Sequence, residues 1–209
     1  MTRGRLGTWY DRVVLAQILD RGMRGVDPLR GELLAGAAGR TIEIGFGTGS
    51  NLPHYPAAVS TLVAVEPSEG LASVAAARLA AWDRPHEVVV QSGSRQLPFD
   101  AGSFDTVVIT FVLCSARRVP ALLAEARRLL RPGGQLLLAE HIVAAGAGHR
   151  ACQTALRPLW KACLGGCDPT SDPRPALRAA GFDPSALTST RLALPWLVSP
   201  GLHGAARTA

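Results

Sequence analysis

A run of alternating glycines directly after a short apolar segment constrains this chain more than any other feature. Residues 41–44 read TIEI and lead into Gly45, Gly47 and Gly49, with Glu43 two residues before the first glycine. Glycine lets a backbone turn sharply and approach a ligand without a Cβ clash. A glycine cluster alone also fits an ordinary tight turn, so the neighbouring sequence has to decide between a turn and a binding loop.

A second acidic residue favours the binding loop. Residues 61–65 (TLVAV) predict another strand, which ends at Glu66-Pro67, about 20 residues beyond the glycines. A carboxylate at that place can accept hydrogen bonds from both ribose hydroxyls of a nucleoside cofactor. An exposed charge at the end of a strand is the alternative interpretation of Glu66. The combination of strand, glycines and two acidic residues indicates a nucleoside-binding site.

The rest of the chain alternates short apolar strands with helices. Further strands are expected over residues 87–91, 106–110 and 135–139, and helices over 68–82 and 120–130. An amphipathic helix over 11–20 (broken by Gly22, Gly25 and Pro28), helices over 151–164 and 175–180, and strand-like segments over 187–192 and 202–207 complete the pattern. The alternation predicts an α/β fold with a mostly parallel sheet and helices on both faces, in a single domain.

Composition and charge exclude several classes of protein. A length of 209 residues suits one domain, and a hydrophobic fraction of 47% argues against wholesale disorder. The apolar runs are far shorter than the ~18 residues of a spanning helix, and the first residues lack the apolar stretch of a signal peptide, so we expect a cytoplasmic protein without a membrane span. The net charge of +6 invites a nucleic acid, but the arginines are scattered and Lys161 is the only lysine. No nucleic-acid partner is therefore expected.

The cysteines do not show the spacing of a metal site. Cys114, Cys152, Cys163 and Cys167 make no CxxC pair, although Cys163 and Cys167 lie four residues apart with His149 nearby. Because the paired spacing of a zinc site is missing, no metal is expected. Reduced thiols are expected in a chain without a signal peptide, and Cys114 is expected to pack as a small hydrophobic residue.

The spacing of the glycines distinguishes between nucleoside cofactors. A dinucleotide site reads G-x-G-x-x-G, whereas residues 45–49 read G-x-G-x-G behind Glu43. This pattern resembles the first motif of the class I S-adenosylmethionine-dependent methyltransferases. Later segments resemble further motifs of that family in order and spacing: LPF at 97–99, GSFD at 102–105 and LRPGG at 130–134.

Other segments resemble one branch of that superfamily, the methyltransferase-like proteins that include the mammalian alkyl-thiol methyltransferases. These segments are GTGSN (47–51), Tyr55-Pro56, VLCS (112–115), Glu140-His141, Trp160-Lys161, Gly166-Cys167 and the tail from Pro195-Trp196 to His203-Gly204. The resemblance extends over about residues 10–207. It implies a Rossmann-like methyltransferase fold with a seven-stranded sheet over residues 1–209, and S-adenosyl-L-methionine as the cofactor.

The resemblance also implies where the cofactor binds. Glu43 would serve its positively charged side and Glu66 its ribose, while Gly93, which stands where many relatives have an acid, leaves the adenine to Ser94 and Leu97. Tyr10 resembles a tyrosine that closes over the cofactor in related enzymes, although a core aromatic is an equal alternative. The expected cofactor-binding residues are Tyr10, Glu43, Gly45, Gly47, Gly49, Asn51, Glu66, Pro67, Gly93, Ser94, Leu97 and Phe111.

The methyl acceptor is expected beyond the carboxyl ends of the fourth and fifth strands, where open α/β sheets bind ligands. That places residues 110–115 and Glu140-His141 at the site. His141 is the candidate base because an unperturbed histidine titrates at about pH 6.5, and a structural histidine is the alternative. Residues 1–30 are expected to form an N-terminal helical cap, and residues 145–185 to cover the acceptor site.

The resemblance implies a methyltransferase that acts on a small-molecule acceptor, foremost a thiol or dithiol of xenobiotic or natural-product origin. Methyl transfer from a sulfonium is an in-line displacement that depends chiefly on positioning, and a thiolate is intrinsically nucleophilic. The alternative is O- or N-methylation of a phenol, quinone, lipid or amine. A more remote alternative is a non-catalytic protein that binds the cofactor or a nucleic acid. The oligomeric state is left open.

Overall fold

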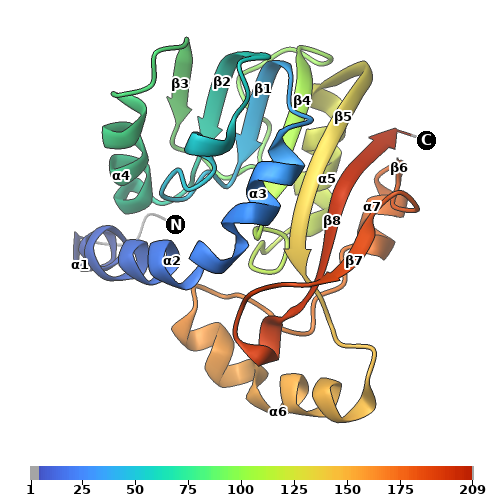
Figure 1. Ribbon diagram of the computed structural model, residues 1–209. Helices are drawn as coiled ribbons and strands as arrows, with labels where there is room; N and C mark the ends of the chain where they lie inside the picture. Colours follow the sequence, from blue (N-terminus) through green and yellow to red (C-terminus); the bar gives the residue numbers. More distant parts are fainter. Residues whose placement is uncertain (1–4, 209) are drawn as a thin grey trace.

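Five parallel strands form the centre of the computed structural model, which describes residues 5–208 (Figure 1). They are β1 (Gly39–Ile44), β2 (Val59–Val65), β3 (His86–Val89), β4 (Phe104–Thr110) and β5 (Leu130–His141). Three antiparallel strands follow: β6 (Phe182–Asp183), β7 (Thr188–Arg191) and β8 (Pro200–Thr208). The sheet order is β3-β2-β1-β4-β5-β8-β6, with β7 paired to β8. The expected mostly parallel sheet is confirmed, and β6, two residues long, is an additional strand that the sequence did not predict.

Helices cover both faces of the sheet, as expected. On one face, α3 (Asp27–Leu34) and α4 (Glu69–Leu79) share a core with the strands through Leu34 and Leu79, both fully buried. On the other face, α5 (Val119–Leu129) and α7 (Arg174–Ala179) do the same through Leu123 and Leu177. Val107, Val108 and Ile109 of β4 are completely buried, which explains why that strand is continuously apolar in sequence.

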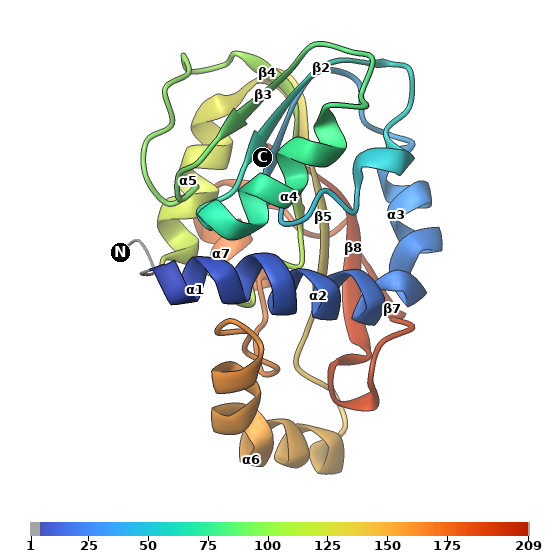
Figure 2. The same cartoon turned by 90° about the vertical axis from the view of Figure 1, so that its left-hand side faces the viewer.

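The N-terminal segment runs along the carboxyl-end edge of the parallel strands, beneath α4 (Figure 2). It comprises α1 (Arg5–Tyr10), a π-helical turn η1 (Asp11–Leu15), α2 (Ala16–Gly22) and a 3-10 turn η2 (Arg24–Val26). A Cβ on Gly70 would lie 2.4 Å from the carbonyl oxygen of Thr8, so this segment packs directly on the start of α4. The helix expected over residues 11–20 is present, with a π-helical first half.

Two expectations about breaks in the chain were wrong. Pro28 was expected to end a helix, but it occupies the first turn of α3, where a missing N–H group costs nothing. The sequence Pro132-Gly133-Gly134 was expected to precede the fifth strand, but β5 already begins at Leu130 and includes it. The register shifts where Phe104 pairs with Leu130, and this irregularity accommodates the proline and glycines at one end of the strand.

The long helix α6 (Ala147–Cys163) lies beyond the carboxyl-end edge, away from the body of the sheet (Figures 1 and 2). Gln153 is its buried residue: its amide oxygen accepts the N–H of Ala144 at 2.8 Å, and its amide nitrogen donates to the carbonyl of Leu197 at 2.9 Å. Leu197 belongs to η4 (Trp196–Val198), and another 3-10 turn, η3 (Leu52–His54), follows the glycine loop. Over the described residues, no helix combines the length and apolar character needed to cross a bilayer.

Candidate active site

The glycine loop directly follows β1, as predicted, and its three alternating glycines have different surroundings. All have positive φ, at 84° for Gly45, 58° for Gly47 and 84° for Gly49. A Cβ on Gly45 would lie 2.3 Å from Cγ2 of Val112, and one on Gly49 would lie 2.9 Å from the ring of Phe46. Nothing lies within 4 Å of the corresponding position on Gly47. Two glycines therefore permit close packing, and the third leaves an open side of the backbone for a ligand.

Glu66, at the end of β2, turns its carboxylate toward the glycine loop. Its oxygens accept the N–H of Gly47 at 2.9 Å and the N–H of Ser68 at 2.8 Å. Burial raises the pKa of Glu66, and these two N–H groups act in the opposite direction by stabilising the ionised form. Since a carboxylate offers about four acceptor positions, the two backbone contacts leave room for the hydroxyls of a ribose. The residues present thus fit a nucleoside cofactor.

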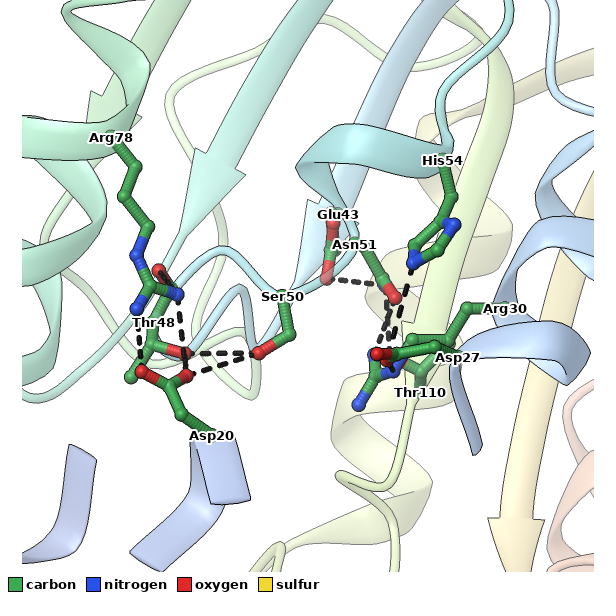
Figure 3. Close-up of polar contacts among 10 residues, drawn as sticks. All are labelled: Asp20, Asp27, Arg30, Glu43, Thr48, Ser50, Asn51, His54, Arg78 and Thr110. Carbon is green, nitrogen blue, oxygen red and sulfur yellow. Dashed lines mark hydrogen bonds and ion pairs between the residues drawn. The ribbon is translucent and has the colours of Figure 1, made fainter. Parts of the chain in front are cut away.

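Glu43 lies in a buried network of side chains between β1 and the segment after the glycine loop (Figure 3). Its carboxylate accepts a hydrogen bond from Nδ2 of Asn51 at 2.8 Å and one from the Tyr55 hydroxyl at 2.6 Å. Burial raises the pKa of Glu43 to about 7, against the opposing effects of Tyr55 and Arg30. Its expected contact with the cofactor's ammonium stays a prediction, because here both oxygens hold neighbouring side chains in place.

Arg30, on α3, joins this network and was not predicted from the sequence (Figure 3). Its Nη1 donates to Oδ1 of Asn51, whose amide nitrogen also donates to the Thr110 hydroxyl at 2.9 Å. The guanidinium carbon stands 5.6 Å from the centre of the Phe111 ring. The helix that carries Arg30 was itself missed, so no local signal marked this cation.

A second polar network connects the N-terminal segment to the glycine loop (Figure 3). The Thr48 hydroxyl donates to Asp20 at 2.6 Å, and Arg78 of α4 donates to the Thr48 carbonyl at 2.9 Å. Arg78 also forms an ion pair with Asp20. Burial opposes ionisation of Asp20, but Arg78 and Thr48 outweigh it, so the pKa of this carboxyl is lowered. These contacts therefore hold the glycine loop, α2 and α4 together.

The residues expected at the adenine lie close to the core. A Cβ on Gly93 would be 2.2 Å from Cγ2 of Ile44, so no larger residue fits there without rearrangement. Leu97 is buried, and its N–H donates to the Glu125 carboxylate at 2.7 Å. Ser94 is partly exposed and donates to the carbonyl of Arg118 at 3.4 Å. Among these three residues, Ser94 is the one that solvent reaches most easily.

The remaining expected cofactor residues, Pro67, Tyr10 and Phe111, differ in their exposure. Pro67 is exposed, and Tyr10 is 37% exposed at the end of α1. Phe111 is partly buried and has a φ of 58°, the sole positive φ of a non-glycine residue in the described part of the chain. Such a backbone conformation is costly and persists where the surroundings enforce it, frequently at active sites.

Those surroundings come from Glu140, near the end of β5. Its carboxylate accepts the backbone N–H groups of Val112 at 2.6 Å, Leu113 at 2.7 Å and Cys114 at 3.4 Å. Burial raises the pKa of Glu140 to about 7, although the charge of His141 and these N–H groups favour the ionised form. The buried carboxylate thus sets the path of the chain from Phe111 to Cys114.

His141 is brought together with two cysteines that the sequence analysis did not connect to it. Its Nε2 stands 2.9 Å from Sγ of Cys167, and the indole N–H of Trp160 donates to the same sulfur at 3.4 Å. Ligand atoms of His141, Cys167 and Cys114 all lie within 4.8 Å of one another. His141 is 3% exposed, and its Nδ1 is buried without a hydrogen-bond partner among residues 5–208. We call these three residues the thiol–imidazole cluster.

The negative charge of this cluster belongs on Cys167. The neighbouring Cys114 thiol lowers the pKa of Cys167 to about 5 despite its burial, and the same contact raises the pKa of Cys114. The adjacent His141 ring stabilises the same thiolate. Burial lowers the pKa of His141, but its contact with Cys167 outweighs this, so that the net shift is upward. A thiolate next to an imidazolium is the favoured state of the cluster.

The residues weighed from the sequence as metal ligands do not come together. Cys163 is exposed, and His149 stacks on Trp196 with ring centres 3.9 Å apart. Cys114 is buried as expected but faces a polar partner. The sequence did place residues 110–115 and His141 at one edge of the sheet, whereas Cys167 and Trp160, beyond β5, carried no local signal that linked them to His141.

Comparison with known proteins agrees with a nucleoside-binding site at the glycine loop. Residues 42–138 match a family model described as a methyltransferase domain. The chain is 33% identical to the human thiol S-methyltransferase TMT1A over 81% of this chain and 72% of that protein. It is 35% identical to a demethylmenaquinone methyltransferase of Clavibacter sepedonicus, over 56% of this chain and 44% of that protein.

A solved structure supports the fold independently. The geranyl diphosphate C-methyltransferase from Streptomyces coelicolor, in complex with S-adenosyl-L-homocysteine, superimposes with a TM-score of 0.67 at 17% identity. The match covers 88% of this chain and 79% of that one. The protein therefore belongs to the class I S-adenosylmethionine-dependent methyltransferases, within the branch of the thiol S-methyltransferases TMT1A and TMT1B. Its cofactor is S-adenosyl-L-methionine.

Proposed function

We propose that this protein methylates the sulfur of a small-molecule thiol. The observation that carries the proposal is the thiol–imidazole cluster, buried at the carboxyl ends of β4 and β5, on the same edge of the sheet as the glycine loop. The identity with a human thiol S-methyltransferase supports the same acceptor class. A xenobiotic or natural-product thiol or dithiol is the acceptor we propose.

On the cofactor side, the chain's own residues have separate tasks. Glu66 binds the ribose while its backbone contacts fix its orientation. Arg30 offers a positive charge toward the amino-acid part of the cofactor, and Asn51, held by Glu43, keeps that guanidinium in place. The adenine lies near Ser94, and the N-terminal cap with Tyr10 excludes water from the cofactor site. Positioning of this kind accounts for much of the rate of a displacement reaction.

On the acceptor side, residues 145–185 cover the site. Asp168 forms ion pairs with Arg157 at 2.6 Å and Lys161 at 3.1 Å, both on α6, so the segment after the helix is fastened to it. In the reaction the acceptor sulfur bonds to the methyl carbon while the bond between that carbon and the sulfonium sulfur breaks, leaving the electron pair on the cofactor. The acceptor must lose its proton, and the thiol–imidazole cluster, which includes His141, is the titratable group we place at that step.

The test uses three acceptors that share one ring and differ in the nucleophilic atom: thiophenol, phenol and aniline. We expect S-adenosylhomocysteine and methyl phenyl sulfide from thiophenol, detected by mass spectrometry, and no methylated product from the other two. In His141→Gln, kcat should fall while the Kd for the cofactor stays unchanged. Turnover of phenol or aniline at least as fast as thiophenol contradicts the proposal, as does the absence of product from a panel of thiols when the cofactor binds.

A quinone or phenol acceptor is the second candidate function. The similarity to a demethylmenaquinone methyltransferase favours it, although that match covers a smaller part of both chains than the match to TMT1A. The same assay with a demethylated quinone separates the two candidates, because a quinone methyltransferase would leave thiophenol unchanged.

A further inference from the structure

The thiol–imidazole cluster is assembled from three segments that the fold holds in fixed positions. Cys114 follows β4, His141 ends β5, and Cys167 follows the positive-φ residues Gly165 and Gly166 behind α6. The N–H of Asp168 donates to the carbonyl of Cys114 at 2.8 Å, which joins the two cysteine segments directly. The backbone contacts of Glu140 fix the Cys114 side. Backbone hydrogen bonds therefore hold the segments of Cys114 and Cys167 in place without involving the two sulfur atoms.

The spacing of the three ligand atoms is close to that of a tetrahedral metal site. Zinc binds sulfur at about 2.3 Å and imidazole nitrogen at about 2.0–2.1 Å, which separates neighbouring ligand atoms by roughly 3.5–3.8 Å. The contact of His141 with Cys167 is 2.9 Å, and all three ligand atoms lie within 4.8 Å of one another. Side-chain shifts of about 1 Å or less bring every pair into the range of a zinc site.

The charge and the type of these ligands also fit zinc. Two thiolates and a neutral imidazole carry two negative charges, which one Zn²⁺ ion neutralises in a buried place where uncompensated charge is costly. The indole N–H of Trp160 donates to Cys167, a contact that orients and stabilises a metal-bound thiolate. Soft sulfur and nitrogen ligands disfavour magnesium and calcium, which bind oxygen.

The number of ligands indicates a catalytic rather than a structural site. Structural zinc sites are closed by four protein ligands, whereas catalytic sites have three and keep one position open. Glu140 is the nearest further candidate on β5, but its carboxylate oxygens already accept three backbone N–H groups. The cluster therefore supplies three ligands and leaves the fourth position to an exogenous molecule.

We propose that Cys114, His141 and Cys167 bind a zinc ion whose fourth coordination position takes the sulfur of the acceptor thiol. The second half of this inference rests on the proposed function. The thiol binds as the thiolate and releases its proton to solvent, because coordination to zinc deprotonates a thiol. The thiolate then attacks the methyl group as described above, and the thioether product leaves because it is a much weaker ligand. His141 acts as a ligand in this scheme and not as the base.

The first test measures zinc in the purified full-length protein under reducing conditions. We expect about one zinc ion per chain by elemental mass spectrometry, in line with one three-ligand site, and at least a tenfold loss of zinc affinity in Cys114→Ala, Cys167→Ala and His141→Gln. Cys152→Ala and Cys163→Ala are matched controls, since both cysteines are exposed on α6, and they should bind zinc like the wild type. If Cys114→Ala does not fold, Cys167→Ala, which alters a less buried side chain, decides.

Equal zinc affinity in the wild type and the ligand variants overturns the site. So does a disulfide between Cys114 and Cys167 in the freshly isolated protein if the reduced protein has no zinc affinity, since the pair would then be redox-active.

The second test replaces zinc with Co²⁺, whose visible and near-ultraviolet absorption reports the ligands of a tetrahedral site. We expect thiolate-to-cobalt bands that change when thiophenol is added and stay unchanged with phenol. An unchanged spectrum with thiophenol refutes coordination of the acceptor. Zinc binding without turnover of any thiol would leave the metal site standing and remove the proposed function. Full thiol turnover by the metal-free protein would keep the proposed function and refute coordination of the acceptor thiol to zinc.

Discussion

Two buried glutamates occupy corresponding places at the two halves of the carboxyl-end edge. Burial raises the pKa of both Glu43 and Glu140 to about 7. Glu43 holds side chains that follow within a dozen residues, Asn51 and Tyr55, whereas Glu140 holds backbone N–H groups from Val112 to Cys114, far earlier in the chain. The side-chain contacts of Glu43 are thus local in sequence, whereas those of Glu140 join distant segments.

Removing the carboxylate should lower the free energy of unfolding more at Glu140, in the acceptor half, than at Glu43. Glu140→Ala leaves three backbone N–H groups without an acceptor, two of them on buried residues, and should lower the free energy of unfolding by about 3 kcal/mol or more. Glu140→Gln keeps one acceptor oxygen and should lose about half as much. Urea unfolding monitored by circular dichroism measures both. A loss in Glu140→Ala no larger than in Glu43→Ala would remove the contrast between the two halves.

In the cofactor half, the raised pKa of Glu43 should make the free energy of unfolding depend on pH. The pKa of Glu43 is about 7 in the folded protein, whereas an unperturbed glutamate has a pKa of 4.5, so the folded state keeps its proton up to a higher pH. The free energy of unfolding should therefore fall as the pH rises from about 4.5 to about 7, by up to about 3 kcal/mol from this residue, and then level off. In Glu43→Gln the fall should be smaller, because one contribution is lost while Glu140, Glu66 and His141 still contribute with the same sign. Identical profiles for the two proteins would show that Glu43 titrates normally.

The two kinds of glycine in the loop should separate stability from cofactor binding. Gly45→Ala places a methyl group against Val112 at a φ of 84° and should cost about 2 kcal/mol of stability. Gly47→Ala meets no neighbour and should cost about 1 kcal/mol, from its positive φ alone. It should still weaken cofactor binding strongly, as measured by calorimetry. If Gly47→Ala binds the cofactor like the wild type, the open side of the loop is not the binding surface.

The smallest effect is expected at the Tyr55 hydroxyl. Tyr55→Phe removes one of the two side-chain donors to Glu43 and should lower the free energy of unfolding by about 1 kcal/mol. It should also raise the pKa of Glu43 further, because a contact that favours the carboxylate is lost. Chemical denaturation at pH 5 and pH 8 tests this, and the stability difference between wild type and variant should be larger at pH 8.

The contrast between local and long-range contacts also explains which features of the fold and the site could be predicted from the sequence. The strands, the glycine loop and Glu66 were predicted because each is encoded within a few consecutive residues. The position of His141 at the carboxyl-end edge of the sheet followed from strand order in an α/β sheet. Arg30 could not be found from the sequence because a proline commonly breaks a helix, whereas Pro28 lies in the first turn of α3. Cys167 was missed because its contact with His141 depends on how the chain returns from α6, which no periodicity in sequence specifies.

The attachment of α6 has a consequence for how this enzyme could acquire new acceptors. Gln153 alone among the residues of that helix is buried, and it hydrogen-bonds to backbone groups at both sides. The outward positions, such as Leu156 and Leu159, therefore carry little of the folding energy and can vary at low cost. Under the proposed function, in which residues 145–185 cover the acceptor site, a directed library restricted to this helix would change the acceptor range and leave the cofactor half intact.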